Sequence, residues 1–349
     1  MTELQQPVAR AIAALASGQH LGEELTTAAF EQLMRGEATP VQAAALLTGL
    51  RVKGETAEEI AGAVRALRGA MVRVPVRADR RLIDTCGTGG GTVSTFNIST
   101  AAALVAVGAG VAVAKHGNRS FTSRCGSADV AEALGLPVQL DARAAARVLE
   151  AGGLVFLFAP LYHPAMRFVA PVRRELAIPT VMNVIGPLAN PAGVRRQVVG
   201  VADAARGPLL ADALRRLGAD HALVVHARVG MDEIAPSGPT EVWEVTDREV
   251  RTWTLDPADY RLQEDHLEDL AGGDPPQNAM RIKGLLADPR RDRVGRATVL
   301  LNAGAALYVA GLAGSLGEGV ECARAALDEG RAAKALERWL EPTRLSTSA

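Results

Sequence analysis

The chain has 349 residues, enough for about two domains, because a single hydrophobic core rarely grows beyond roughly 250 residues. It is 48% hydrophobic and 22% charged with a formal net charge of −1, a composition typical of a packed protein rather than a disordered chain. This balance also excludes a whole-chain electrostatic attraction to nucleic acid. We therefore expect one large and one small domain and no nucleic-acid partner.

The cysteines and the apolar runs indicate where in the cell the protein is expected. Cys86, Cys125 and Cys322 are odd in number and far apart, so we expect neither a disulfide framework nor a zinc site. The first residues are polar and lead into an amphipathic run, unlike a signal peptide. Apolar runs such as 101–113 are shorter than the roughly 20 residues that a spanning helix needs. These features favour a cytoplasmic protein without a membrane partner.

The first part of the chain has a helical pattern. Between 6 and 72, apolar residues recur at helical spacing in several segments separated by glycines. Thr39 and Thr56 are expected helix starts, because a hydroxyl can accept hydrogen bonds from free backbone amides. A basic stretch with a proline, 72–79, is the expected linker.

Beyond the linker, strands alternate with helices. The expected strands are 81–85, 111–114, 154–158, 197–201 and 222–225, and the expected helices are 101–107, 128–134, 142–150 and 208–217. This order predicts a mainly parallel central sheet flanked by helices, with ligands outside the carboxyl ends of its strands. The predicted fold is α/β, with a small all-helical domain over 1–72, joined by helices from about 159–183, and a larger α/β domain over 80–349.

A glycine-rich loop follows the first expected strand. Residues 87–91 read Gly-Thr-Gly-Gly-Gly, and Thr95, Asn97, Ser99 and Thr100 follow at the start of a helix. Glycines let backbone amides approach a ligand closely, and a helix start adds free amides and a positive dipole end. A tight turn would explain the glycines alone, but it does not require the hydroxyls. The loop therefore predicts a phosphate site.

The loop after the second expected strand is rich in donors. Cations and hydroxyls at a strand end suit a diphosphate, since each can donate to its oxygens. The alternative is a solvated basic loop with Ser127 as a helix cap. The residues concerned are Lys115, His116, Asn118, Arg119, Ser120, Ser123 and Ser127.

Two adjacent acids, Asp232 and Glu233, come shortly after the expected strand 222–225. Carboxylates at a strand end are typical ligands of magnesium that is shared with substrate phosphates. Adjacent acids are also common on protein surfaces, so the pair alone does not distinguish a magnesium site from an ordinary acidic surface.

Several long motifs occur together and in order: GTGG, TFNIST, KHGNRS, GSAD, HPAM with PVRREL, NVIGPLANP and MDE. With these motifs the chain resembles the anthranilate phosphoribosyltransferases over almost its whole length. The resemblance implies a helical domain packed on an α/β domain, a homodimer and a requirement for Mg²⁺. It also implies transfer of the phosphoribosyl group of 5-phosphoribosyl 1-diphosphate (PRPP) to the amine of anthranilate, with release of diphosphate, in tryptophan biosynthesis.

The same resemblance implies roles for individual residues. The expected PRPP contacts are Gly87, Gly90, Gly91, Thr95, Asn97, Ser99, Thr100, Lys115, Asn118, Arg119, Ser120, Ser123 and Ser127. The expected anthranilate contacts are Gly87, Asn118 and Arg173, with His116, His163 and Met166 close by. Asp232 and Glu233 are the expected Mg²⁺ ligands, with Ser99 beside the metal. No general base stands out, and Asn118 and Arg173 are expected to position the substrate.

The residues themselves also favour Arg173. It follows Met166, Val169 and Ala170 at helical spacing, so one helix face could offer an apolar surface for an aromatic ring and a guanidinium for its carboxylate. A surface arginine in an ion pair is the alternative. His163 could equally be a packing residue at a helix start.

One position departs from the family. Gly91 stands where the family usually has aspartate, so we expect either weaker organisation of the metal or compensation by the hydroxyls of Thr92 and Ser94. Two other functions were weighed: a pyrimidine-nucleoside phosphorylase, whose KHSTGG motif is missing, and a relative that lost catalysis and binds nucleic acid. The net charge and the retained Asp232 and Glu233 oppose the latter.

Overall fold

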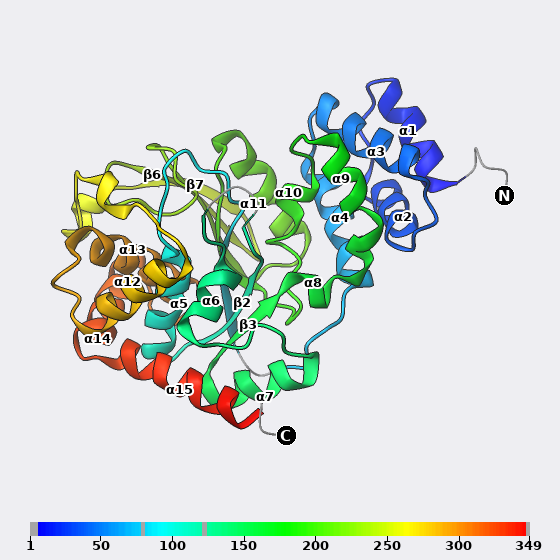
Figure 1. Ribbon diagram of the computed structural model, residues 1–349. Coiled ribbons are helices and arrows are strands. Elements are labelled where there is room, and N and C mark those ends of the chain that lie inside the picture. The colour runs from blue at the N-terminus through cyan, green and yellow to red at the C-terminus, as the bar shows by residue number, and fades with distance from the viewer. Residues whose placement is uncertain (1–5, 78–80, 121–123, 347–349) are drawn as a thin grey trace.

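The computed structural model describes residues 6–77, 81–120 and 124–346. It consists of a small helical bundle beside a larger α/β unit (Figure 1). The described residues begin in the bundle and end in the last helix of the α/β unit (Figure 1). No helix among these residues is both long and apolar enough to cross a membrane.

The bundle begins with α1 (Pro7–Ala16), α2 (Glu23–Met34), α3 (Pro40–Lys53) and α4 (Ala57–Ala70). Both expected helix starts are confirmed. The hydroxyls of Thr39 and Thr56 accept from the amides of Gln42 and Glu59, 3.2 Å away in each case, and both pairs form capping boxes. The local sequence therefore defines where α3 and α4 begin.

The α/β unit contains a seven-stranded sheet in the order β3-β2-β1-β4-β5-β6-β7. The strands are β1 (Leu82–Gly87), β2 (Ala112–Gly117), β3 (Leu154–Phe158), β4 (Arg196–Gly200), β5 (His221–Ala227), β6 (Thr240–Thr246) and β7 (Val250–Leu255). The first five are parallel, as expected, but β6 and β7 form an antiparallel edge that the sequence analysis missed. β6 is rich in β-branched and aromatic residues, Val242, Trp243 and Val245 between two threonines, and this composition favours a strand.

Helices cover both faces of this sheet. Besides α1 to α4, the helices of the described residues are α5 (Ile98–Gly108), α6 (Ser127–Leu134), α7 (Ala142–Gly152), α8 (Ala159–Tyr162), α9 (Ala170–Leu176), α10 (Met182–Ile185), α11 (Gly207–Arg216), α12 (Pro275–Ala287), α13 (Arg293–Val309), α14 (Leu316–Asp328) and α15 (Arg331–Ser346), with short 3-10 turns η2 (Pro164–Phe168), η3 (Ala204–Arg206), η4 (Pro257–Tyr260) and η5 (Leu267–Leu270). The expected strands and helices of this part each overlap an observed one.

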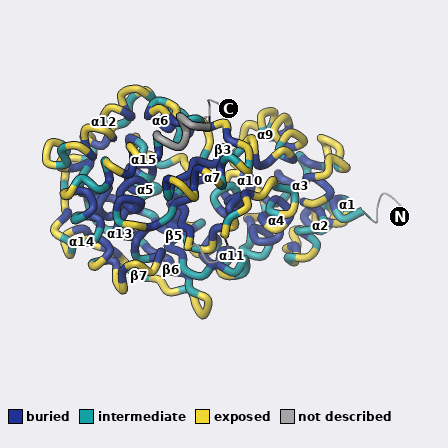
Figure 2. The backbone as a smooth tube through the Cα atoms, turned by 90° about the horizontal axis from the view of Figure 1, so that it is seen from below, coloured by how far each residue is buried: buried dark blue, intermediate teal, exposed yellow. Residues whose placement is uncertain are grey.

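The two faces of the sheet belong to different hydrophobic clusters. In β5, Leu223 and Val225 join the core with α5 and α13, whereas Ala222 and Val224 join a core with α11. This second core continues without a break into the helical bundle, and buried backbone runs through both parts in Figure 2. The bundle is thus packed on the sheet face that α11 covers, and the fold holds it in one place relative to the strand ends.

The single helix expected around Met166 and Arg173 is wrong. The structure has the turn η2 and the separate helix α9, with Val169 between them, and Ala170 is exposed while Val169 is buried. Prolines at the start of both elements explain the break, because they lack the amide hydrogen that a continuous helix would use. Both elements pack on the bundle: η2 contacts α2 and α4, and α9 contacts α3.

Candidate functional site

The strand order reverses between β1 and β4, and this is where loops from three strands meet. In open α/β sheets a ligand crevice forms at such a switch point. A Cβ at Gly200, the last residue of β4, would overlap the carbonyl oxygen of Asp232. The acidic loop after β5 therefore lies directly over the end of β4, which brings it beside the glycine loop that follows β1.

The glycine loop is joined to the acidic loop by hydrogen bonds. The amide of Gly89 donates to Oδ2 of Asp232 over 2.9 Å, and the amide of Thr92 donates to the carbonyl of Gly230 over 2.9 Å. Gly89 and Gly90 have φ values of 69° and 86°, the left-handed region that glycine tolerates best. Glycine at positions 89 and 90 thus suits the conformation of the loop, and one of its amides, that of Gly89, donates to an anion, the Asp232 carboxylate.

Gly91 lies in the same contact. A Cβ at this position would be 3.3 Å from Oδ1 of Asp232 and 3.0 Å from the carbonyl oxygen of Gly230. The aspartate that the family usually has here would therefore place a second carboxylate next to Asp232. Thr92 turns its hydroxyl to the Gly230 carbonyl, 3.4 Å away, so this side chain contributes to holding the two loops together.

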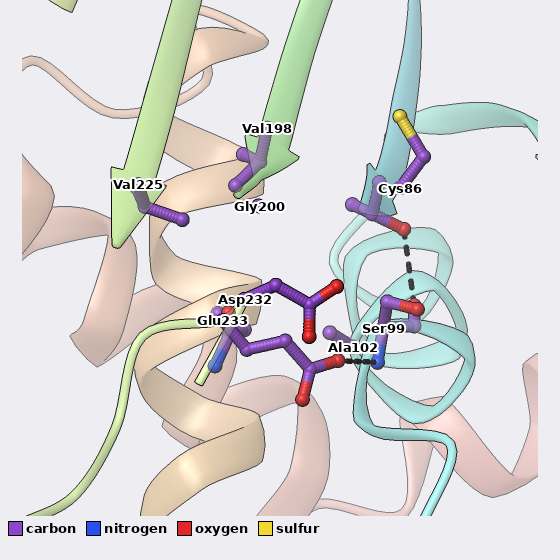
Figure 3. Close-up of a pocket in the computed structure, with 10 residues that line it drawn as sticks. Cys86, Ser99, Ala102, Val198, Gly200, Val225, Asp232 and Glu233 are labelled. Atoms are coloured by element: carbon purple, nitrogen blue, oxygen red, sulfur yellow. Dashed lines mark hydrogen bonds between the residues drawn. The ribbon is translucent and has the colours of Figure 1, made fainter. Parts of the chain in front are cut away.

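The acidic pair is partly buried and reaches toward α5. Oε1 of Glu233 accepts the amide hydrogen of Ser99 over 3.1 Å, and the side chain of Asp232 lies beside it (Figure 3). Burial raises the pKa of both carboxyl groups, and the neighbouring Asp232 raises the pKa of Glu233 further. Two partly buried carboxylates that line one pocket with Ser99 suit Mg²⁺, which takes one or two carboxylates and completes its shell with water and phosphate oxygens. The described residues contain no cluster of three or more His, Cys, Asp or Glu that could hold a metal alone.

Lys115 is not at the surface of the site. Its ammonium lies among buried groups, where it donates to the carbonyl of Thr85 and, over 3.0 Å, to the hydroxyl of Ser99. Burial lowers its pKa. Lys115 thus ties the ends of β1, β2 and α5 together, beneath the loop rather than in front of it.

The rest of the second loop is held by acids and by the start of α6. Arg119 is an exposed residue whose Nη1 lies 2.7 Å from both Asp129 and Glu132, and Oδ1 of Asn118 accepts the Arg119 amide over 2.8 Å. The amide of Ser120 lies 3.4 Å from Oδ2 of Asp129. The Ser127 hydroxyl lies 3.4 Å from the Asn118 carbonyl, and Ser123 is outside the described residues.

The three polar residues that follow the glycine loop, Thr95, Asn97 and Thr100, differ in how far they are exposed. Thr95 is partly exposed, and the amide of Asn97 is bonded to neighbouring protein groups. Thr100 is buried, and its hydroxyl has no hydrogen-bond partner among the described residues. The spacing in the sequence did not separate these side chains, because burial on α5 depends on what packs against the helix.

The expected anthranilate residues fall into two groups. His116, at the end of β2, and His163, just before η2, are buried with their Nε2 atoms 3.3 Å apart. Burial lowers their pKa to about 3 and about 4, so the rings are neutral at physiological pH and one donates to the other. Met166 lies in η2, directly after His163, and its amide donates to the His163 carbonyl over 3.0 Å.

Arg173 is partly buried on α9, and burial lowers its pKa. Its guanidinium makes no hydrogen bond or ion pair with the other described residues, which disfavours the alternative of a surface ion pair. A partly buried guanidinium without a carboxylate leaves its donors available for an anion.

Sequence reasoning missed a buried polar pair below the loops. Asp84, in the middle of β1, accepts from the amide of His116 over 3.2 Å and from Nδ2 of Asn190 over 2.8 Å. Asn190 also donates to the Ala114 carbonyl over 2.8 Å. Burial raises the Asp84 pKa to about 6. An acid inside an apolar strand was the available signal.

Comparison with known proteins agrees with this architecture. Residues 9–71 match the model of the glycosyl transferase family helical bundle domain, and residues 79–333 match that of the glycosyl transferase family a/b domain. The class of protein is therefore a two-domain glycosyl transferase.

Relatives narrow the class. The chain is 50% identical over 329 residues to the anthranilate phosphoribosyltransferase of Rubrobacter xylanophilus, covering 94% of this chain and 95% of that protein. The enzyme of Roseiflexus castenholzii is 49% identical over 335 residues, which is 96% of this chain and 98% of the relative. The chain belongs to the anthranilate phosphoribosyltransferase family.

Solved structures give the same result. Anthranilate phosphoribosyltransferase from Thermus thermophilus superposes with a TM-score of 0.90 at 43% identity, covering 96% of this chain and 99% of that one. The Saccharomyces cerevisiae enzyme in complex with PRPP and Mg has a TM-score of 0.88 at 26% identity, covering 97% and 98%. The yeast enzyme has also been solved with 4-fluoroanthranilate, at a TM-score of 0.87 and 25% identity over 99% of each chain.

Proposed function

We infer that this chain transfers the phosphoribosyl group of PRPP to the amine of anthranilate, giving N-(5-phosphoribosyl)anthranilate and diphosphate, a step of tryptophan biosynthesis. One observation carries the inference: the glycine loop and the partly buried pair Asp232 and Glu233 meet at the switch point of the sheet. This juxtaposition fits a phosphorylated sugar whose diphosphate is bound together with Mg²⁺. The relatives' names supply the acceptor, anthranilate.

The PRPP side of the site is proposed as follows. The amides of the glycine loop and the start of α5 bind phosphate oxygens, with Gly87, Gly90, Gly91, Thr95, Asn97, Ser99 and Thr100 as the loop residues concerned. Asp232 and Glu233, with Ser99, hold Mg²⁺, which supplies positive charge to the departing diphosphate when bound. Lys115 acts from below by holding Ser99 and the end of β1 in place. Asn118, Arg119, Ser120, Ser123 and Ser127 complete the diphosphate side.

The reaction is substitution at the anomeric carbon, with oxocarbenium character as the diphosphate departs. The nucleophile is a neutral aromatic amine, so orientation contributes more than deprotonation. We assign Asn118 and Arg173 to orienting anthranilate, with the free guanidinium of Arg173 facing the carboxylate. The neutral pair His116 and His163, with Met166 close by, lines the ring side.

The test is a fluorescence assay of anthranilate consumption by the purified protein with PRPP, with and without Mg²⁺. We expect loss of anthranilate fluorescence only when PRPP and Mg²⁺ are both present. No consumption at any Mg²⁺ concentration would overturn the assignment. Phosphate-dependent cleavage of thymidine or uridine in a parallel assay would instead assign the chain to nucleoside phosphorolysis.

We also propose the domain division given above, with 1–72 and about 159–183 forming the small domain and 80–349 the large one. Contacts of η2 and α9 with the bundle support it, because they attach the later segment to the first four helices. If the two domains close on the substrates, the hinge should lie near 72–79 and 158–179. Residues 1–5, 78–80, 121–123 and 347–349 of these ranges are outside the described residues.

A homodimer is proposed as the working assembly. Val41 and Val52 on α3 are 78% and 81% exposed, and 11 residues are about three helical turns, so both lie on one face. A second copy is the occupant we expect there. Light scattering should give twice the chain mass, and Val41→Glu with Val52→Glu should give the monomer; an unchanged mass would place the interface elsewhere.

A cytoplasmic location completes the proposal. None of the three cysteines, all of which are described, forms a disulfide, which agrees with a reducing compartment. Fractionation of the source cells with an antibody to the chain tests the assignment.

A further inference from the structure

Asn278 is a buried residue on α12, far from the glycine loop in sequence and in contact with it in the fold. Its Nδ2 donates to Oδ1 of Asn97 over 3.0 Å, and its own Oδ1 accepts the amide hydrogen of Gly273 over 2.7 Å. Only 3% of Asn278 is exposed. We propose that Asn278 is a positioning residue for PRPP binding, which acts by fixing the orientation of the Asn97 amide. This rests on the proposed role of Asn97 as a PRPP contact.

The hydrogen bonds around Asn97 decide which way its amide faces. Its oxygen receives Asn278 and lies 3.3 Å from the thiol of Cys125, while its nitrogen donates to the Cys125 carbonyl over 3.3 Å. The other N–H of this amide makes no hydrogen bond to a described residue. One donor at the start of α5 is therefore left for a ligand, and it remains a donor only while the oxygen stays on the Asn278 side.

The Asn278 segment also supports the backbone of the loop. The amide of Phe96 donates to the Leu270 carbonyl over 2.9 Å, and a Cβ on Gly272 would overlap the carbonyl oxygen of Thr95. The segment 270–272, which leads into α12, thus packs directly against the residues that enter α5. Burial raises the pKa of the Cys125 thiol to about 11, which keeps it a neutral group beside the amide.

An unfixed amide costs binding in two ways. Without the Asn278 donor, the buried Asn97 oxygen loses its best partner, and rotation by half a turn would present an oxygen to the phosphate instead of an N–H. The phosphate would then meet a repelling acceptor. The effect falls on PRPP and leaves the anthranilate side unaffected.

The test uses Asn278→Ala and the near-isosteric Asn278→Asp, in the full-length protein. PRPP binding is measured by titration calorimetry with Mg²⁺ present, and steady-state constants are measured for both substrates. We expect Asn278→Ala to weaken PRPP binding about five- to tenfold. Asn278→Asp should weaken it more, because a carboxylate attracts the Asn97 nitrogen and so reverses the orientation of the Asn97 amide. The Michaelis constant for anthranilate should change less than about twofold.

A double-mutant cycle separates positioning from structural support. If Asn278 acts through Asn97, adding Asn278→Ala to Asn97→Ala should change PRPP affinity by less than about twofold. Independent, multiplying effects would overturn the proposal. So would a variant with a lowered melting temperature and unchanged PRPP affinity.

Gln277→Ala is the matched control. Gln277 is exposed and forms the capping box of α12 with Asp274, so its loss weakens the same helix start without touching Asn97. PRPP affinity should remain that of the wild type; an equal loss would show that α12 stability, not the Asn278 side chain, is responsible. Because calorimetry needs no turnover, PRPP binding without anthranilate consumption would overturn the proposed function and leave this inference standing.

Discussion

The two charged sides of the site are built in opposite ways. On the acidic side, Asp232 and Glu233 are partly buried, accept one backbone hydrogen bond each, and have raised pKa values. On the basic side, Arg119 is exposed but already paired with Asp129 and Glu132. The two acids thus form no ion pair with another described residue, although the charge of Lys115 lowers the pKa of Glu233, whereas Arg119 already has acids of its own.

The difference shows where binding free energy can come from. Carboxylates that lose hydration and form no ion pair are stabilised when a metal binds, because the cation offsets the cost of their charge. An exposed arginine must exchange one anion for another, and such pairs contribute little. We therefore expect changes on the acidic side to have large effects and changes around Arg119 to have small ones.

The largest effect is expected from Asp232→Asn. The amide keeps an oxygen for the Gly89 amide but removes the charge that Mg²⁺ requires, so kcat/KM for PRPP should fall at least about 100-fold. The measurement is kcat/KM as a function of Mg²⁺ concentration. Asp247→Asn, at an exposed position between β6 and β7, is the control. An unchanged Mg²⁺ dependence would remove Asp232 from the metal site.

Asp84 lies below the acidic and basic sides of the site, and its role can be tested through the free energy of unfolding. Burial raises its folded pKa to about 6 from the ordinary 3.8, so its contribution to stability is complete below about pH 4 and is lost as pH rises through 6. Relative to Asp84→Asn, the wild type should lose about 3 kcal/mol of unfolding free energy over this window. Urea unfolding from pH 4 to 7 measures it. The amide of the variant also faces Asn190, a cost that does not vary with pH. If the unfolding free energies of the wild type and Asp84→Asn changed in parallel with pH, the raised pKa of Asp84 would be contradicted.

Arg173→Ala should act on the other substrate. Loss of an unpaired guanidinium that faces a carboxylate should raise the Michaelis constant for anthranilate about tenfold or more, with that for PRPP nearly unchanged. Arg174→Ala, at the exposed next position of the same helix, is the matched control. Equal effects of the two variants would show that Arg173 does not contact anthranilate.

Gly91→Asp tests the acidic side of the site by adding a carboxylate beside Asp232. Its Cβ would be 3.3 Å from Oδ1 of Asp232, so the added carboxylate should raise the pKa of Asp232 and make Mg²⁺ binding fall more steeply as pH is lowered. At pH 8 we expect half-maximal activity at about threefold lower Mg²⁺. Gly91→Ala controls for the tight contact with Gly230. If both variants behave alike, the carboxylate contributes nothing.

The smallest effect is expected on the basic side. Glu132→Gln removes one of the two acids that hold Arg119 and should improve PRPP affinity by about twofold, less at high salt. Calorimetry at two salt concentrations measures it. A loss of affinity would mean that Glu132 presents Arg119 to the diphosphate rather than competing for it.

Much of the architecture follows from local pattern. The capping threonines Thr39 and Thr56, the alternation of strands and helices, and the motifs at the strand ends are all visible in the sequence, because helix caps and strand periodicity are properties of neighbouring residues. The glycines of the first loop are readable for the same reason, since their φ values need glycine. The motifs also indicate the family, which the relatives confirm.

What the sequence by itself could not decide is which side chains face a ligand. Lys115 and Arg119 look alike in the motif, yet one lies buried under the loop and the other is exposed and paired with acids. Asn278 carried no functional signal in the sequence and Asp84 only that of an acid inside an apolar strand, although each holds a predicted site segment in place. Their partners are distant in the chain, and burial, raised pKa values and amide orientation arise only when the sheet and α12 bring those partners together.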